Sequence, residues 1–144
     1  MKIILDTNFL VYCAKEKLDY NEEIQNLINE DYELVVPEQV INELIKIKNK
    51  KNDKVYLYKR KPKFKKTTGR DKEAASLSLQ ILDKNINDNK IKKIKSSGKN
   101  VDDILISLAN ENPKNIVCTL DRGIRKKLGR FILINKFKRL VLTR

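Results

Sequence analysis

The sequence predicts an α/β fold, a three-layer α/β/α sandwich around a mostly parallel central sheet. Short apolar runs alternate with amphipathic segments of helical period along all 144 residues. The composition is 40% hydrophobic and 35% charged, with four Gly and three Pro, which is typical of a chain that folds. A chain of this length is most simply one domain. We therefore expect a single domain over residues 1–144, with a basic insertion at about 50–70.

The first half of the chain predicts two strands, each followed by helix. Residues 2–5 (KIIL) form a short apolar run, and from Asp6 onward the apolar spacing becomes helical. Asn21 is a plausible N-cap for the next amphipathic segment. The predicted elements that follow are a helix at 21–30, a strand at 32–37 closed by Pro37, and a helix at 38–48.

The second half continues the alternation after the basic insertion. A broad apolar face predicts a helix from Asp71 to about Lys84, and NIVCTL at 115–120 is the clearest strand pattern. The remaining predictions are a strand at 91–94, a helix at about 100–111, a helix from 121 to 129, and strands at 131–134 and 139–143.

The charge balance favours a polyanionic partner. The net charge is +13 with a pI near 9.7, and such a field attracts nucleic acid. Residues 50–70 contain ten Lys or Arg and one Asp, a local charge of +9. A basic surface that serves only solubility is the alternative.

The basic insertion also carries aromatic residues. Cationic side chains follow a phosphate backbone while aromatic rings stack on unpaired bases, so the segment predicts RNA binding. Alternatively, its apolar residues dock it on the core and its lysines stay solvated. The predicted RNA-binding residues here are Lys54, Tyr56, Tyr58, Lys59, Arg60, Lys61, Lys63, Phe64, Lys65 and Lys66.

Acidic residues recur where predicted parallel strands end. Asp6 ends the first strand, Asp121 follows 115–120, and Asp102 with Asp103 opens a helix. Ligands bind outside the carboxyl ends of such strands, so we expect these side chains to converge. Helix capping is the alternative interpretation of each acid taken alone.

Two of the acids occupy apolar faces in the predicted helices. Glu43 falls at the edge of an apolar arc that includes Ile45, and Asp102 falls inside the arc of its helix, whereas Asp103 points away. A carboxylate on a buried face is costly unless it is paired or bound to a cation. We therefore expect Glu43 and Asp102 to face the same crevice as Asp6 and Asp121.

The residue inventory limits which cation this crevice can hold. The chain has no His and two Cys, so only oxygen ligands are numerous, and these suit Mg²⁺ or Mn²⁺. Such an ion lowers the pKa of bound water and polarises a phosphate, which permits phosphodiester hydrolysis without a histidine base. A second basic group begins at Arg122 and includes Arg125, and we expect it to flank the crevice and contact RNA.

Four segments together resemble the PIN-domain ribonuclease family. They are LDTNFLV, VVPEQVINEL, VDDILISLA and VCTLDRGIRKKL, in family order across nearly the whole chain. The resemblance implies an acidic quartet at Asp6, Glu43, Asp102 and Asp121, which is both catalytic and metal-binding. It also implies Asp103 as a further metal-binding acid, and Asn8 and Thr119 as auxiliary residues lining the same pocket.

Two features depart from that family pattern. Gly123 stands where many relatives carry another acid, which affects only an auxiliary ligand, and the basic insertion is shorter or absent in compact members. The overall similarity is to small archaeal-type PIN proteins related to ribosomal-RNA-processing nucleases, and VapC-type toxins share the site. A homodimer, an antitoxin and a ribosome-assembly partner are therefore among the partners that the resemblance implies.

We expect a Mg²⁺- or Mn²⁺-dependent endoribonuclease that acts in the cytoplasm on RNA. No apolar run approaches the length of a membrane span, and Cys13 and Cys118 lie in apolar runs that predict buried, reduced thiols. One alternative is a non-catalytic RNA-binding assembly factor with a degenerate acidic pocket. Another is a receiver-like phospho-acceptor domain, for which a positive charge of this size is unusual.

Overall fold

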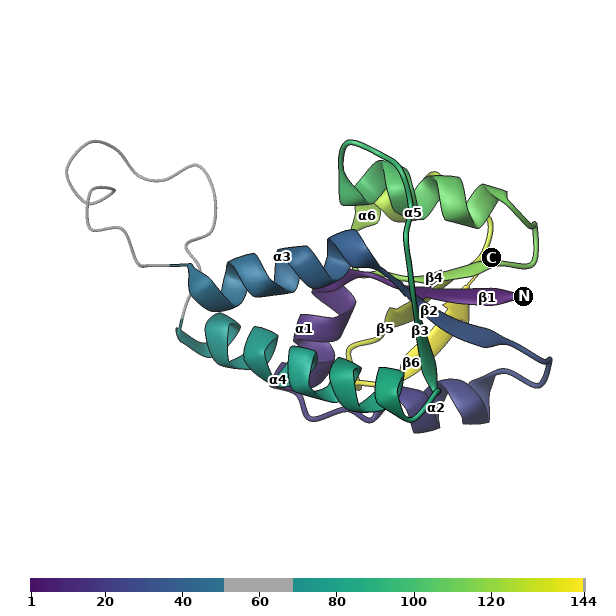
Figure 1. Ribbon diagram of the computed structural model, residues 1–144. Coiled ribbons are helices and arrows are strands. Elements are labelled where there is room, and N and C mark those ends of the chain that lie inside the picture. Colours follow the sequence, from purple (N-terminus) through teal and green to yellow (C-terminus); the bar gives the residue numbers. More distant parts are fainter. Residues whose placement is uncertain (51–68, 144) are drawn as a thin grey trace.

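The computed structural model describes residues 1–50 and 69–143, and its centre is a six-stranded sheet in the order β3-β2-β1-β4-β5-β6 (Figure 1). Neighbouring strands pair in parallel except β5 and β6, which form an antiparallel pair. The predicted α/β sheet is confirmed. The strands are β1 (Lys2–Leu5), β2 (Glu33–Pro37), β3 (Ile91–Ile94), β4 (Ile116–Cys118), β5 (Phe131–Ile134) and β6 (Leu140–Thr143).

Helices cover both faces of the sheet. Figure 1 shows α5 and α6 on one face and α1, α2 and α4 on the other, while α3 packs along α4. This division follows from right-handed crossovers, because the chain leaves β1 toward β2 but leaves β3 and β4 in the opposite direction. The helices are α1 (Thr7–Lys15), α2 (Tyr20–Leu27), α3 (Glu38–Asn49), α4 (Gly69–Asn87), α5 (Val101–Asn110) and α6 (Arg122–Arg125).

The direction of the connections reverses between β1 and β4, which lie side by side at the centre of the sheet. Both strands are buried on each face, and Ile3, Ile4, Leu5 and Ile116 are completely inaccessible to solvent. The backbone amide of Asp6 continues the pairing with a 3.1 Å hydrogen bond to the Cys118 carbonyl. The crevice at the carboxyl ends of β1 and β4 is thus held by the most buried part of the core.

Several element boundaries differ from the sequence prediction. Helix α2 begins at Tyr20 because Asp19, not Asn21, caps it, accepting a 3.2 Å hydrogen bond from the Glu22 amide. Helix α4 extends beyond both predicted ends, and α6 has four residues rather than the predicted nine-residue segment. The prediction of helix through 121–129 was wrong, because turns follow Arg125 before β5 begins.

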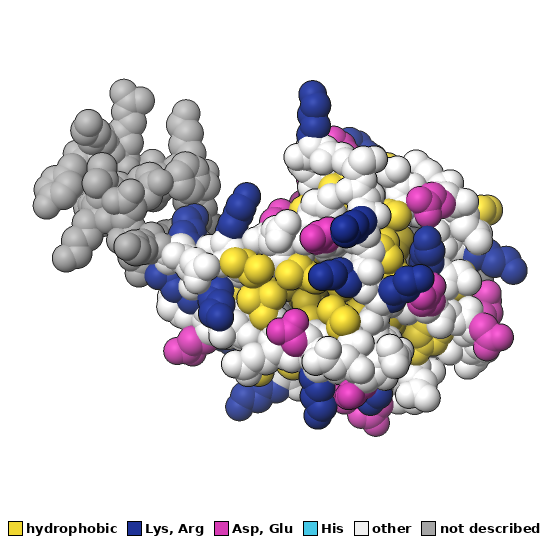
Figure 2. Space-filling model, viewed as in Figure 1, with side chains coloured by type: hydrophobic (Ala, Val, Ile, Leu, Met, Phe, Trp, Pro, Cys, Tyr) yellow, Lys and Arg dark blue, Asp and Glu magenta, His cyan; other side chains and the backbone are white. Residues whose placement is uncertain are grey.

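Two further predictions concern single side chains. Ile45 was placed among the buried residues of α3, but it is 41% exposed, and Figure 2 shows apolar side chains at the surface over α3 and α4. Cys13 and Cys118 are free and buried, as predicted, and burial raises the pKa of the Cys13 thiol to about 12. None of the helices within the described ranges is long and apolar enough to cross a membrane.

Candidate active site

Asp6 is the most buried acid at the carboxyl end of the sheet, with 4% of its surface exposed. It ends β1 and caps α1, and its Oδ1 accepts a 2.7 Å hydrogen bond from the Thr7 amide. Its Oδ2 accepts a 2.6 Å hydrogen bond from the hydroxyl of Thr119, which follows β4 and is fully buried. The carboxylate is therefore fixed from two adjacent strands.

Glu43 reaches the same region from α3. It is half-buried, and its Oε2 accepts a 2.8 Å hydrogen bond from the Thr7 hydroxyl. Thr7 thus contacts two acids, through its amide to Asp6 and through its side chain to Glu43. Glu43 lies at the edge of the apolar face of α3, as its helical position predicted.

Asp121 follows β4 and caps the short helix α6. Its Oδ1 accepts hydrogen bonds of 2.7 Å from the Gly123 amide and 3.2 Å from the Ile124 amide. Its own amide donates to the Thr119 hydroxyl at 3.1 Å, so Thr119 contacts both Asp6 and Asp121. Asp121 caps α6 and also faces the crevice, because both capping bonds go to Oδ1 and leave Oδ2 clear of them.

Asp102 also reaches the crevice, but not from a buried face. The helical wheel placed it inside the apolar arc of α5, whereas the structure leaves it exposed at the rim of the pocket. Asp103 is exposed as well and does not line this pocket, in agreement with its opposite direction on the wheel. The prediction of a buried Asp102 was therefore wrong, while its position near the other acids holds.

These side chains line one pocket of about 570 Å³ at the carboxyl ends of β1, β2 and β4. Asn8 belongs to it, and its Oδ1 accepts a 3.2 Å hydrogen bond from the Leu120 amide. Thr119 supports the pocket from beneath rather than lining it. The lining residues are Asp6, Thr7, Asn8, Val11, Tyr12, Lys15, Glu43, Ile47, Asp71, Asp102, Leu120 and Asp121.

Loss of solvent, with a smaller contribution from neighbouring negative charge, raises the pKa of two of these groups. Burial raises the pKa of Asp6 to about 6, hydrogen bonds from Thr119 and Thr7 oppose the rise, and the charges of Glu43 and Asp102 add to it. Partial desolvation at the pocket rim also raises the pKa of the exposed Asp102, with further contributions from the charges of Asp121 and Asp103. The acids are close enough to destabilise one another's ionised forms.

The donor set fits a hard divalent cation. The pocket offers carboxylate and amide oxygens, and the mutual repulsion of its acids is the cost that a bound cation would remove. Within residues 1–50 and 69–143, no three acidic, His or Cys side chains approach closely enough to hold an ion directly. Mg²⁺ commonly binds through one or two carboxylates and several waters, and a pocket of this volume suits that mode.

The predicted RNA-binding residues fall into two groups. Arg122 and Arg125 do not line the acidic pocket; they line a neighbouring hollow, and the Arg125 guanidinium lies 5.8 Å from the centre of the Phe131 ring. The others lie outside the described residues, as does nearly all of the basic insertion. They are Lys54, Tyr56, Tyr58, Lys59, Arg60, Lys61, Lys63, Phe64, Lys65 and Lys66.

Sequence reasoning missed several residues that build the pocket. Thr7 separates Asp6 from Asn8 and carried no signal beyond that position, although a hydroxyl beside two acids is a natural positioning group. Lys15 and Asp71 form an ion pair in the pocket wall, joining α1 to α4. Nothing in the sequence pairs Lys15 with Asp71, because 55 positions separate them.

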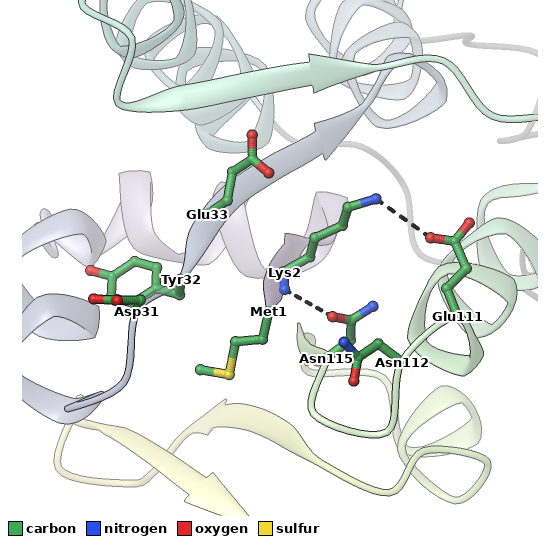
Figure 3. Close-up of a pocket in the computed structure, with 8 residues that line it drawn as sticks. All are labelled: Met1, Lys2, Asp31, Tyr32, Glu33, Glu111, Asn112 and Asn115. Carbon is green, nitrogen blue, oxygen red and sulfur yellow. Dashed lines mark hydrogen bonds and ion pairs between the residues drawn. The ribbon is translucent and has the colours of Figure 1, made fainter.

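A second cavity of about 480 Å³ lies at the opposite end of the sheet (Figure 3). Its polar groups contact one another: the Lys2 amide donates to Asn115 at 2.8 Å, and the Lys2 ammonium lies 3.5 Å from Glu111. The Asn115 side-chain amide also donates to the Leu108 carbonyl at 2.9 Å. These contacts tie β1 to the segment between α5 and β4, and we assign them a structural role.

Known proteins resemble this chain in sequence and in fold. A family model described as a PIN like domain matches residues 3–56. The chain is 28% identical over 127 residues to Ribonuclease VapC4 from Methanocaldococcus jannaschii. The aligned region covers 88% of this chain and 82% of that protein.

Two solved structures are also similar. The PIN domain endonuclease Utp24 matches with a TM-score of 0.67 and 16% identity, covering 99% of this chain and 91% of that one. VapBC2 from Rickettsia felis, bound to a DNA fragment from their promoter, gives a TM-score of 0.49 at 13% identity, covering 92% and 98%. At 16% identity, the likeness to Utp24 concerns the fold alone. The chain is thus similar to PIN-domain proteins, in sequence over residues 3–56 and in fold to the PIN domain endonuclease Utp24.

Proposed function

We propose that this protein is a divalent-metal-dependent endoribonuclease whose active site is the acidic pocket. One observation carries the proposal: acids from four separate segments, Asp6, Glu43, Asp102 and Asp121, line a single pocket at the reversal point of the sheet. The similarity to Ribonuclease VapC4 supports the choice of RNA as substrate. The proposed domain spans residues 1–144.

The four acids would together hold Mg²⁺ or Mn²⁺, some of them through coordinated water, and the ion when bound supplies an activated water and stabilises charge on the phosphate. Asp103 would contribute negative charge from outside the pocket rather than direct ligation. Glu43 and Asp121 are both candidates to accept a proton, because each is half-buried and keeps one carboxylate oxygen, Oε1 or Oδ2, clear of these hydrogen bonds.

The remaining pocket residues orient the acids and shape the site. Thr7 and Thr119 hold Glu43 and Asp6 in fixed rotamers, so less ordering is needed when an ion or substrate binds. Asn8 offers an amide at the pocket mouth while its Oδ1 contacts the Leu120 backbone. Val11, Tyr12 and Ile47 provide apolar wall, which limits the access of bulk water.

The partners that we propose are RNA and, for regulation, a protein that covers the acidic pocket, as an antitoxin or a ribosome-assembly partner would. A role in ribosomal RNA processing and a toxin-type role both require the same site, and the homodimer stays a prediction. The non-catalytic RNA-binding factor differs in one respect only, because it binds RNA without metal-stimulated cleavage.

Cleavage of a structured RNA in Mn²⁺, with and without EDTA, separates these functions. We expect the wild-type protein to cut in Mn²⁺ and not after EDTA is added, and Asp6→Asn to remove cleavage while retaining RNA binding. Asp83→Asn is the matched control, because Asp83 is exposed on α4 and does not line the pocket. Full activity of Asp6→Asn, or cleavage unaffected by EDTA, would refute the mechanism; binding without any cleavage would identify the non-catalytic factor.

A further inference from the structure

A second hollow, of about 350 Å³, lies directly beside the acidic pocket. The two share Tyr12 and Leu120 as a common wall. None of the residues lining the hollow is acidic, and three are cationic, so negative and positive surfaces adjoin along this wall. The lining residues are Tyr12, Leu120, Arg122, Arg125, Leu133, Ile134, Asn135 and Lys136.

The three cations come from two elements beyond the sheet centre. Arg122 directly follows Asp121, Arg125 lies one turn further along α6, and Lys136 belongs to the turn between β5 and β6. The ion pairs found in the described parts of the chain involve other cations, so no acid neutralises these three. Unneutralised cations that converge on one hollow favour the binding of an anion.

Arg125 is the cation with the most fixed position. Its guanidinium packs over Phe131, and its Nε is buried without a hydrogen-bond partner among the described residues. This cation–π contact, 5.8 Å from the ring centre, keeps the guanidinium at the wall of the hollow, and a guanidinium binds phosphate oxygens through two parallel N–H groups. An anion in this hollow therefore meets a preorganised donor.

An aromatic ring stands beside the hollow. Phe137 is 73% exposed, and the Lys136 ammonium lies 5.1 Å from the centre of its ring. A large apolar ring with this exposure on a charged turn is a surface on which an unpaired base can stack. A cation next to an exposed ring is a combination suited to single-stranded nucleic acid.

We propose that the basic hollow binds a backbone phosphate of single-stranded RNA, next to the phosphodiester held in the acidic pocket, with Phe137 stacking on an adjacent base. The inference rests on the ribonuclease function proposed above, and it defines the substrate as an unpaired segment. The cations of the hollow offset the repulsion between phosphates and the neighbouring acids.

The test measures RNA binding by fluorescence anisotropy in the Asp6→Asn protein, so it does not depend on cleavage. The probe is a labelled single-stranded RNA of roughly 12 nucleotides, a length within the usual site sizes of proteins that bind single strands. The hollow variant carries Arg122→Ala and Lys136→Ala in the Asp6→Asn protein, and both side chains are exposed. The control, Lys90→Ala with Lys114→Ala, removes the same charge from exposed positions that precede β3 and β4, at the opposite end of the sheet.

We expect the hollow variant to bind about tenfold more weakly than the control variant. The slope of log binding constant against log salt concentration should become shallower by about 0.7 for each phosphate that the hollow variant no longer binds. A neutral methylphosphonate linkage at one defined position of the RNA should weaken its binding to the protein that carries only Asp6→Asn. The same linkage should not weaken binding to the hollow variant. Equal affinities of the hollow and control variants, or identical effects of the neutral linkage in both proteins, would overturn the proposal.

Two further measurements separate this inference from the proposed function. Phe137→Leu should weaken binding of the single strand but not of a duplex of the same sequence, and equal effects on both would refute single-strand selection. In the otherwise wild-type protein, the hollow variant should raise KM with little change in kcat. If the wild-type protein cleaves RNA and the hollow variant keeps the wild-type KM, this inference fails and the ribonuclease function stands. If the wild-type protein does not cleave RNA, the anisotropy measurement still tests whether the hollow binds RNA.

Discussion

The Thr7 hydroxyl donates a 2.8 Å hydrogen bond to Glu43 Oε2, joining the first residue of α1 to the second turn of α3. The Thr7 amide simultaneously contacts Asp6. One threonine therefore sets the positions of two acids that come from different parts of the chain, and the spacing within the acidic pocket depends on it.

Replacing Thr7 with Val should reduce kcat by about 10- to 100-fold, because Glu43 loses the group that orients it. The shapes of the two side chains are similar, and the Thr7 amide still contacts Asp6, so the free energy of unfolding should fall by only about 1 kcal/mol. Single-turnover cleavage and urea unfolding measure the two effects. Thr7→Ser keeps the hydroxyl and should retain most activity; equal losses in both variants would exclude orientation as the role.

The Asp6 carboxyl should make the protein less stable as the pH rises. Its pKa is about 6 in the folded protein and near 3.8 when unperturbed, so the native state binds more protons between these values. The contribution is complete below about pH 4 and lost above about pH 6, a difference of about 3 kcal/mol. Because Asn does not ionise, the stability of Asp6→Asn relative to wild type should rise by about this amount between pH 4 and 7.

Urea unfolding in EDTA at several pH values measures that difference, and titration of the other groups largely cancels in the comparison. The Asp83→Asn protein should show no comparable change relative to wild type, since Asp83 is exposed. A constant difference between Asp6→Asn and wild type across this range would show that Asp6 ionises normally.

Thr119→Val should raise the pKa of Asp6 further, because the Thr119 hydroxyl bond is the strongest influence that lowers it. The substitution also leaves the Asp121 amide without its 3.1 Å acceptor, which should cost about 1–3 kcal/mol of stability. Carbon-13 NMR of the Asp carboxyl groups in metal-free buffer follows the titration directly. An unchanged or lower pKa would contradict the assigned role of Thr119.

Asn115→Ala should destabilise the fold without changing the chemistry of the acidic pocket. Asn115 is 5% exposed and bridges the Lys2 amide and the Leu108 carbonyl at the far end of the sheet. Losing both bonds should cost about 2–4 kcal/mol. At a temperature where the variant is fully folded, kcat should match that of wild type. A selective loss of kcat there would indicate that the cavity in Figure 3 influences the active site.

The sheet and the approximate positions of the acids were predictable from the sequence, because each depends on local patterns. Continuous apolar runs such as KIIL identify strands buried on both faces, and an acid directly after such a run lies at a carboxyl end. Glu43 was also predictable, since helical periodicity placed it at the edge of an apolar face.

Features that depend on tertiary packing were not predictable. Asp102 fell within an apolar arc, yet its side chain lies at the open rim of the pocket, exposed in the first turn of α5. The Lys15–Asp71 ion pair joins segments far apart in sequence, and Lys136 lines the same hollow as Arg122 from a different element. Helix α6 is short because the chain turns into β5 soon after Arg125, and apolar periodicity carries no record of that turn.

The central claim is that Asp6, Glu43, Asp102 and Asp121 form one cation site. Mn²⁺ titration by isothermal calorimetry tests it most directly, comparing wild type with Asp6→Asn, Glu43→Gln, Asp102→Asn and Asp121→Asn, and with Asp83→Asn as the control. We predict one class of Mn²⁺ site, weakened at least about tenfold by each of the four substitutions and unchanged in the control. Mn²⁺ affinities in the four variants equal to that of wild type would contradict the account.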